Sequence, residues 1–285
     1  MANQTIVVVP TYNEAANLPA LVDRLLSLSV PNLELLFVDD ASPDGTGQIA
    51  EDLAREFPGR IHVIHRPGKL GLGTAYLQGF RWALEHGADY VIQMDADFSH
   101  SPEYLPQFLE FAQEFDVVVG SRYVHGGQVD EHWSPGRRLL SWWANSVWTQ
   151  LILGVKTRDA TGGFKCWRRS ALEQIDLQKV RSSGYVFQVE MCFAAERLGL
   201  RIKEIPIYFP DRHIGKSKMS VLVKLEAAWR VFEIRWRYQT ARRIKRTPRA
   251  ATVPLASHTT SIVKGHRRGE SALRGVPRHK DRQRH

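Results

Sequence analysis

The sequence predicts an α/β protein with a doubly wound, mostly parallel sheet, and three observations carry this prediction. Apolar segments of strand length alternate with amphipathic helical segments throughout residues 5–120. The first strand-like segments are apolar without interruption, as in strands that helices cover on both faces. Acidic and polar residues directly follow several of these segments. Strands that alternate with helices are joined by crossovers, which make neighbouring strands parallel.

The first half of the chain supplies five expected strands with helices between them. Residues 5–9 form a β-branched run, residues 17–28 carry leucine and valine at helical spacing, and residues 33–38 are a second buried strand before a turn-rich loop at 40–45. There follow a helix at 47–57, a strand at 61–65, a helix at 74–86, a strand at 90–94, a helix after Pro102 and a strand at 116–120. Such sheets bind ligands beyond the carboxyl ends of their strands, which here are followed by residues 10–14, 39–44, 95–100 and 121–123.

The second half is less regular. We expect helices at 137–153, 187–198 and 221–236 and a strand at 202–209, and four of the eight tryptophans stand at positions 133, 142, 143 and 148. Apolar periodicity stops after about residue 240. We therefore expect one folded domain over residues 1–240 and a disordered tail over residues 241–285.

The net charge of +9 belongs to the tail. Residues 241–285 contain 13 Lys/Arg and 2 Asp/Glu, whereas residues 1–240 contain 26 and 28. The tail has no aromatic residue for stacking on bases, and the body is nearly neutral, so no nucleic-acid partner is expected. Cys166 and Cys192 are not spaced like metal ligands, and two cysteines make a disulfide framework unlikely. A reducing compartment is therefore favoured. We expect neither a signal peptide nor a membrane span, because no apolar run approaches the necessary length.

The strongest chemical signal is the pair Asp95 and Asp97 at the end of an expected strand. Two carboxylates one residue apart project to the same side of an extended chain, and Mg²⁺ or Mn²⁺ bridges such carboxylates to substrate phosphates. An acidic surface loop is the alternative for this pair taken alone. Residues 39–40 and 10–14 end two further strands, however, and ribose hydroxyls and a base N–H suit Glu14 and Asp40 as hydrogen-bond partners. Tyr12 would stack on a base, or would simply be a rim aromatic, and Asp40 alone would also suit a turn or helix cap.

Basic residues at the same edge suit phosphate groups. Arg122 follows a strand directly, Arg137 and Arg138 begin an expected helix with Ser141 one turn later, and residues 211–218 carry Arg212 and Lys218. The planar guanidinium of arginine bonds two phosphate oxygens at once. The alternative for the segment at 211–218 is a solvated basic loop.

Several motifs together resemble one family. They are Pro-Thr-Tyr-Asn-Glu (10–14), Asp-Asp (39–40), Ser-Pro-Asp-Gly-Thr (42–46), Gly-Leu-Gly-Thr-Ala-Tyr (71–76), Asp-Ala-Asp-Phe-Ser-His (95–100), Gly-Ser-Arg-Tyr (120–123), Thr-Gly-Gly-Phe (161–164), Gly-Tyr-Val-Phe-Gln-Val-Glu (184–190) and Asp-Arg-His-Ile-Gly-Lys-Ser-Lys (211–218). In this order they resemble the dolichol- and polyprenol-phosphate mannosyltransferases, inverting family-2 glycosyltransferases with the GT-A fold. The resemblance covers about residues 5–235 and leaves the tail out.

The resemblance implies a role for each matching position. GDP-mannose would lie against Pro10, Tyr12, Glu14, Val38 and Asp40 at its nucleoside end, and against Asp95, Ala96, Asp97 and Ser99 at its diphosphate, with Arg212 and Lys218 closing over it. Asp97 and Ser99 would bind Mg²⁺ or Mn²⁺, and Asp95, Asp97, Arg122 and Arg212 form the implied catalytic set. Arg122, Arg137 and Ser141 would hold the acceptor phosphate. Some relatives carry Gln in place of Ser99, and the pair Trp142-Trp143 is more aromatic than the family pattern.

The implied reaction moves mannose from GDP-mannose to a polyprenyl or dolichyl phosphate with inversion. The phosphate acceptor is already ionised near neutral pH, so no general base is required. Alternatives are a glucosyl- or aminosugar transferase with the same acceptor, or a sugar-nucleotide-binding protein without turnover. The enzyme is expected in the cytoplasm, peripheral at the cytoplasmic face of a membrane, with amphipathic interface helices at 133–153 and 221–236, the basic tail as a second contact and a membrane-anchoring protein as a further partner. The alternative for the tryptophans is packing in the core.

Overall fold

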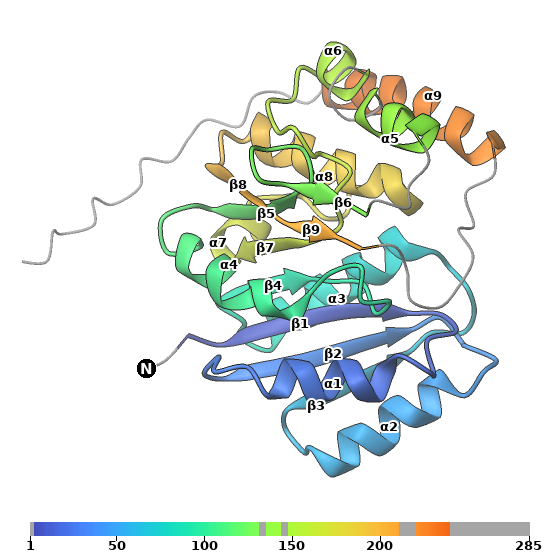
Figure 1. Ribbon diagram of the computed structural model, residues 1–285, viewed down its shortest axis with the longest axis vertical. Coiled ribbons are helices and arrows are strands. Elements are labelled where there is room, and N and C mark those ends of the chain that lie inside the picture. The colour runs from blue at the N-terminus through green and yellow to red at the C-terminus, as the bar shows by residue number, and fades with distance from the viewer. Residues whose placement is uncertain (1–2, 131–134, 144–147, 211–220, 240–285) are drawn as a thin grey trace, which may run out of the picture. The chain divides into compact units, whose positions relative to one another are not determined.

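The computed structural model describes residues 3–130, 135–143, 148–210 and 221–239 (Figure 1). The strands of the main sheet are β1 (Thr5–Thr11), β2 (Leu33–Asp39), β3 (Ile61–His65), β4 (Tyr90–Gln93), β5 (Val117–Ser121), β7 (Lys165–Arg168) and β8 (Ile202–Pro206). The helices are α1 (Leu18–Leu26), α2 (Thr46–Glu56), α3 (Leu72–Glu85), the 3₁₀ helix η1 (Pro102–Tyr104), α4 (Leu105–Phe111), α5 (Pro135–Trp142), α6 (Gln150–Leu153), α7 (Arg169–Leu172), α8 (Gly184–Arg197) and α9 (Val221–Gln239). Two short strands, β6 (Gln128–Val129) and β9 (Tyr208–Phe209), pair in parallel as a second sheet.

The main sheet has the order β3-β2-β1-β4-β7-β5-β8, and only β7 runs antiparallel among these seven described strands. Alternate residues of β1 enter different clusters: Val7 and Val9 pack with α1 and α4, whereas Ile6 and Val8 pack with α3 and α8. Helices therefore cover both faces of the sheet. This confirms the predicted doubly wound α/β fold, and it explains why the first strands are apolar at every position.

Two predicted elements in the second half differ in detail from the structure. The expected helix at 137–153 is described in parts: α5 and α6 are α-helical, and Trp143, Trp148 and Thr149 between them are π-helical. The Trp143 and Trp148 rings stack with centroids 5.2 Å apart, and hydrogen bonds in a π-helix join residues at this five-residue spacing. The expected strand at 202–209 is divided between β8 and β9, and Ile207 bonds both sheets through its main chain (Ile207 N to Ser121 O 3.1 Å; Gln128 N to Ile207 O 2.9 Å).

A third cluster joins α6, α8 and α9 at one edge of the domain, where α5 also lies (Figure 1). It contains Ile152, Val189, Phe193, Val231 and Ile234, all buried. None of the helices in the part of the chain that the structure describes is both long and apolar enough to span a membrane. Residues 240–285, for which a disordered tail is predicted, lie outside the described residues.

Candidate active site

Three neighbouring strands bring the predicted acidic loops together. In the sheet, β1 lies between β2 and β4 and pairs with both in parallel, so their carboxyl ends reach the same edge. The loop after each strand contains one non-glycine residue with left-handed backbone: Asn13 (φ 61°), Ala41 (φ 53°) and Phe98 (φ 62°). Such conformations cost about 1–3 kcal/mol each and cluster at functional sites. These three strand ends therefore form the candidate site.

Asp39 ties the first two loops to each other. Its carboxylate accepts hydrogen bonds from Thr11 Oγ1 (3.0 Å) and from both the Oγ (2.5 Å) and the main-chain N–H (3.1 Å) of Ser42. The Asp39 carboxylate therefore holds the loops after β1 and β2 together. Of the two apolar positions predicted to border the nucleoside, Pro10 is half-buried at this edge, whereas Val38 is completely buried in the core.

Asp40 is held by an arginine that the sequence analysis did not select. Arg66, which follows β3, forms a buried ion pair with one Asp40 oxygen, and the Gly71 N–H donates to the other (3.0 Å). Gly71 has a φ of 98°, a conformation that favours glycine. Arg66 also donates to Thr74 Oγ1 (2.6 Å). Asp40 therefore links β2 to the start of α3, and Arg66 balances its charge.

Tyr12 and Glu14 lie on the loop after β1, where they were predicted to meet the nucleoside. The Lys69 ammonium stands 3.8 Å from the centre of the Tyr12 ring. Glu14 accepts a hydrogen bond from Asn17 Nδ2 (2.8 Å). Both Tyr12 and Glu14 are half-buried, so each keeps an exposed portion at the edge of the sheet.

Asp95 is bonded from two directions. The Tyr76 hydroxyl donates to Asp95 Oδ1 (2.9 Å), and the Asp95 main-chain N–H donates to His100 Nδ1 (2.9 Å). His100 is buried and stacks on Phe164 with ring centroids 4.9 Å apart. Because Nδ1 accepts this hydrogen bond, the ring proton sits on Nε2 of a neutral imidazole. The side chain of Asp95 itself is 31% exposed.

Asp97 is more deeply placed than Asp95. It is 7% exposed, and its Oδ1 accepts hydrogen bonds from the Ser99 hydroxyl (2.5 Å) and N–H (3.1 Å). Ser99, at 1% exposure, thus supports the Asp97 carboxylate, and Ala96 packs in the core. No group of three or more His, Cys, Asp or Glu side chains suited to a metal ion occurs among the residues that the structure describes.

Arg122 is bound to a second residue that sequence reasoning missed. Its Nε and Nη2 donate to the two oxygens of Asp159 (2.8 and 2.7 Å), its main-chain N–H donates to the same carboxylate (2.9 Å), and Nη2 also reaches Thr161 Oγ1 (3.0 Å). Asp159 is completely buried. Burial alone raises the pKa of Asp159, but the Arg122 guanidinium and its hydrogen bonds lower that pKa below the ordinary value.

The other predicted acceptor residues are only partly described. Ser141 on α5 accepts a hydrogen bond from the Tyr123 hydroxyl (2.7 Å). Because Tyr123 directly follows Arg122 in the sequence, this bond places Ser141 near the loop that carries Arg122. Arg137 also lies on α5, but its side chain is outside the described residues. Arg212 and Lys218 lie outside the described residues altogether.

Two carboxylates from other elements shape the loop that carries Asp159. Glu196 of α8 accepts hydrogen bonds from the main-chain N–H groups of Lys156 and Thr157, and Glu204 of β8 accepts them from Arg158 and Asp159, all at 2.8–2.9 Å. The position of Asp159, and with it that of Arg122, is therefore fixed from the far side of the loop.

A buried lysine lies beneath the site. Lys165 on β7 is fully buried, and its ammonium donates to Gly162 O (2.5 Å) and Gln188 Oε1 (2.9 Å), while Gln93 Nε2 donates to the same Gln188 oxygen (2.5 Å). Burial lowers the pKa of Lys165, because a low-dielectric environment disfavours its charged form.

Replacing Lys165 by methionine is expected to lower the melting temperature at pH 7 by about 2–8 °C, because Gly162 O and Gln188 Oε1 lose their donor in a buried site. The lowered pKa means that the folded wild type loses its proton at lower pH than the unfolded chain, so wild-type stability rises with pH in that window. The loss should therefore grow as the pH approaches 10. Calorimetry of both proteins from pH 7 to 10 measures this difference, and a loss that does not change with pH would contradict it.

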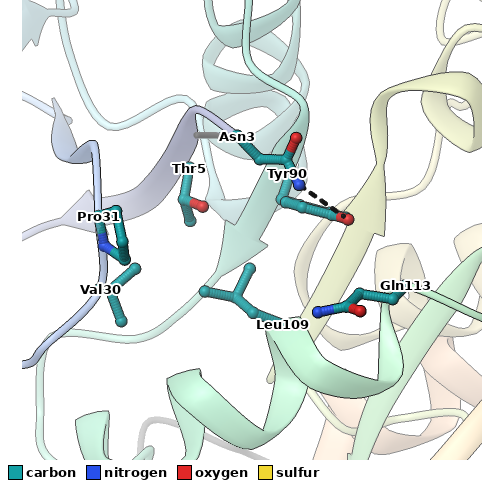
Figure 2. Close-up of a pocket in the computed structure, with 7 residues that line it drawn as sticks. All are labelled: Asn3, Thr5, Val30, Pro31, Tyr90, Leu109 and Gln113. Atoms are coloured by element: carbon teal, nitrogen blue, oxygen red, sulfur yellow. Dashed lines mark hydrogen bonds between the residues drawn. The ribbon is translucent and has the colours of Figure 1, made fainter. Parts of the chain in front are cut away.

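A shallow pocket of about 240 Å³ lies at the other end of the sheet (Figure 2). Its lining includes Thr5 and Tyr90, the first residues of β1 and β4, with Asn3 Nδ2 donating to the Tyr90 hydroxyl (3.5 Å). It faces the amino ends of the strands. It is therefore separate from the loops that carry the predicted chemistry.

Comparisons with known proteins agree with this geometry. Residues 6–176 match the model of glycosyl transferase family 2. An undecaprenyl-phosphate mannosyltransferase of Micrococcus luteus is 48% identical, and the match covers 76% of this chain and 88% of that protein. A polyprenol monophosphomannose synthase of Mycolicibacterium smegmatis is 45% identical, and the match covers 85% of this chain and 92% of that protein.

Solved structures confirm the GT-A fold at lower identity. Mannosyl-3-phosphoglycerate synthase from Rubrobacter xylanophilus superposes with a TM-score of 0.59 at 15% identity, over 84% of this chain and 74% of its own. Glucosyl-3-phosphoglycerate synthase from Mycobacterium tuberculosis, solved with Mn²⁺, UDP-glucose and phosphoglyceric acid, superposes with a TM-score of 0.56 at 17% identity. The match covers 82% of this chain and 78% of that one. With the family model matching more than half of its length, this chain is a glycosyltransferase and belongs to glycosyl transferase family 2.

Proposed function

We propose that the protein transfers a mannosyl group from GDP-mannose to a polyprenyl phosphate and releases GDP. The names of the two relatives, at 45–48% identity, support the transferred sugar and the acceptor. The observation that carries the reaction is the pair Asp95 and Asp97 after β4, with Asp40 after β2, two strands away, and Arg122 after β5 on the same edge of the sheet. This arrangement suits a donor diphosphate between acidic and basic groups.

The residues at this edge fit a divalent cation of the Mg²⁺ or Mn²⁺ type. The described part of the site offers two carboxylates, Asp95 and Asp97, and the Asp95 side chain is partly exposed. The described residues do not supply three or more His, Cys, Asp or Glu ligands for one ion. Such a site suits a cation that takes its remaining ligands from substrate phosphates and water. We propose Asp97 as the main protein ligand, with Ser99 beside it and Asp95 at the exposed side. A bound cation would neutralise charge that develops on the diphosphate leaving group.

At the acceptor side, Arg122 and Ser141 are proposed to hold the phosphate, together with Arg137. Arg122 keeps a fixed orientation because Asp159 bonds two of its nitrogens, so a phosphate meets a positioned guanidinium. No general base is required, because the attacking oxygen of the polyprenyl phosphate is already anionic near neutral pH. Direct attack on the anomeric carbon gives inversion, and the α-linked donor yields a β-linked mannosyl phosphate.

At the donor side, Tyr12, Glu14 and Asp40 are proposed to receive the nucleoside. Arg66 holds one oxygen of the Asp40 carboxylate in an ion pair, and a carboxylate accepts hydrogen bonds from ribose hydroxyls or base N–H groups. Pro10 and the main chain near Val38 border this position. Arg212 and Lys218 are proposed to close over the diphosphate, as the resemblance implies.

The lipid acceptor is proposed to be met at a membrane surface on the cytoplasmic side. Large apolar side chains stand exposed on α5, α6 and α9, which lie together at one edge of the domain (Figure 1). They are Leu139, Trp142, Leu151, Trp229, Phe232 and Trp236. Trp229 and Trp236 are 73% and 72% exposed and lie seven residues apart, on the same face of α9. Exposed tryptophans of this kind favour the boundary between water and lipid.

Replacing both Trp229 and Trp236 by serine is expected to weaken binding to anionic phospholipid vesicles by about 10-fold or more, because two aromatic side chains lose their apolar contact. Co-sedimentation with vesicles measures the binding. Transfer to a short, water-soluble polyprenyl phosphate should stay at the wild-type rate. Unchanged vesicle binding by the double variant would contradict a membrane role for α9.

The reaction itself is tested with the full chain, radiolabelled GDP-mannose, Mn²⁺ and a short polyprenyl phosphate. Label should move into the organic phase, a chelator should abolish the transfer, and the anomeric signal of the product should be that of a β-linked sugar. Transfer from UDP-glucose but not from GDP-mannose would overturn the proposed donor. An α-linked product would overturn the inverting displacement.

A further inference from the structure

Tyr76 places a hydroxyl group from the protein core against the edge of the candidate site. It is fully buried on α3, within a motif that the proposed function leaves without a role. Its ring lies nearly parallel to Phe187 of α8 (centroids 5.8 Å apart, 5° between planes) and also contacts Phe80 at 5.9 Å. This packing fixes the ring and directs the hydroxyl to Asp95 Oδ1, 2.9 Å away.

The hydroxyl serves the carboxylate rather than the packing of the core. A phenylalanine would fill the same space between Phe187 and Phe80, whereas a buried tyrosine needs a hydrogen-bond partner for its hydroxyl. That partner is a side chain that is itself 31% exposed at the site. Tyr76 therefore reaches Asp95 from the protein side and leaves the solvent side open.

The bonds to Asp95 leave one of its oxygens available. Tyr76 holds Oδ1, and His100 Nδ1 accepts from the main-chain N–H. Within the described parts of the chain no hydrogen bond reaches Oδ2, and His100 Nδ1 lies 4.0 Å from it. One oxygen thus sets the direction of the carboxylate, and the other remains for the proposed cation.

The chemical nature of the partner matters as much as its position. Asp40 and Asp159, two buried acids near this edge, are paired with Arg66 and Arg122, whose positive charges offset theirs. Among the described residues, Asp95 is held by a neutral hydroxyl, which orients the carboxylate without offsetting its negative charge. A divalent cation requires that charge, because hard cations bind ionised oxygen ligands.

We infer that Tyr76 is a positioning residue, which orients the Asp95 carboxylate toward the cation that accompanies the donor diphosphate. This inference rests on the proposed function and adds to it a residue outside the substrate contacts. It acts through Asp95 alone, so its removal should change the affinity for the cation and leave metal-free nucleotide binding as it was.

The test compares Tyr76→Phe with the control Tyr90→Phe, the same change at the other end of β4, where the hydroxyl meets Asn3. Mn²⁺ binding to the full chain is measured in the presence of GDP from the electron paramagnetic resonance signal of free Mn²⁺, and GDP binding is measured separately with a chelator. Tyr76→Phe should raise the dissociation constant for Mn²⁺ by about 10-fold or more, the effect of one hydrogen bond to a charged group. Tyr90→Phe should not change it, and metal-free GDP affinity should be the same in all three proteins.

Two further variants separate positioning from a general structural effect. In an Asp95→Asn background, adding Tyr76→Phe should cause little further loss of Mn²⁺ affinity, because the two residues act as one unit. Phe187→Leu keeps the hydroxyl but loosens the ring, and should give a smaller rise in the same dissociation constant. Wild-type Mn²⁺ affinity in Tyr76→Phe overturns this inference and leaves the proposed function standing. Absence of Mn²⁺ binding by the wild type with GDP overturns the proposed metal site, and this inference with it.

Discussion

Replacing Asp97 by asparagine is expected to lower the rate of mannosyl transfer by roughly 10²- to 10³-fold, the usual effect of removing one group that stabilises developing charge. Asparagine keeps the shape of the side chain and can still accept a hydrogen bond from Ser99, so the loop after β4 should keep its form. What it lacks is the negative charge for the cation. Initial rates with GDP-mannose and a short polyprenyl phosphate, measured across a Mn²⁺ titration, quantify the loss.

Asp116→Asn is the matched control for Asp97→Asn. Asp116 directly precedes β5, at the end of the sheet away from the site, and its carboxylate bonds Arg201. This variant should transfer mannose at the wild-type rate. Wild-type activity in Asp97→Asn would remove Asp97 from the proposed metal site. Equal losses in both variants would instead indicate a general effect of acid-to-amide changes on folding.

The order of strands and helices in the first half was predictable because each strand lies between two layers of helices. Its residues are then apolar on both sides, as in β1, and the amphipathic segments between strands become crossovers. The antiparallel strand β7 was not predicted. It has only four residues and carries Lys165, a charged side chain that is fully buried. Hydrophobic patterns assign lysine to the surface, so nothing local identified this strand.

The candidate site was predictable for a different reason. Chain order and the rule that ligands bind beyond the carboxyl ends of parallel strands place the loops after β1, β2 and β4 at one edge, and the structure confirms that these strands are neighbours. The partners of the acids were not predictable. Asp40 meets Arg66 across 26 positions, and Arg122 meets Asp159 across 37. No spacing rule connects such pairs, because tertiary packing alone determines them.

Replacing Arg122 by methionine is expected to lower the free energy of unfolding by about 3–5 kcal/mol, because it leaves the buried Asp159 carboxylate without its charged partner. The corresponding fall in melting temperature is roughly 10 °C for a chain of this size. Differential scanning calorimetry measures both. The double variant Arg122→Met/Asp159→Asn should recover much of the loss, since a neutral side chain costs less to bury than an unpaired charge. If the double variant is no more stable than Arg122→Met, the ion pair is not the cause.

The pH dependence gives this prediction a sign. In the wild type the pKa of Asp159 is lowered, so its contribution to stability is present above the ordinary pKa of aspartate and is lost as the pH falls through the lowered value. Without Arg122, burial dominates and raises that pKa, so the folded variant takes up a proton more readily than the unfolded chain. The destabilisation should therefore be smaller at pH 5 than at pH 7. A deficit that is equal at both values would contradict this account.

The same variant decides whether Arg122 has two roles. A purely structural arginine would reduce activity only in proportion to the unfolded fraction, so well below the melting temperature Arg122→Met would transfer mannose normally. If Arg122 also holds the acceptor phosphate, Arg122→Met should show a higher KM for polyprenyl phosphate at that temperature, with the KM for GDP-mannose unchanged. Arg122→Lys, which keeps the charge but not the planar fork, should fall between the wild type and Arg122→Met in both stability and KM.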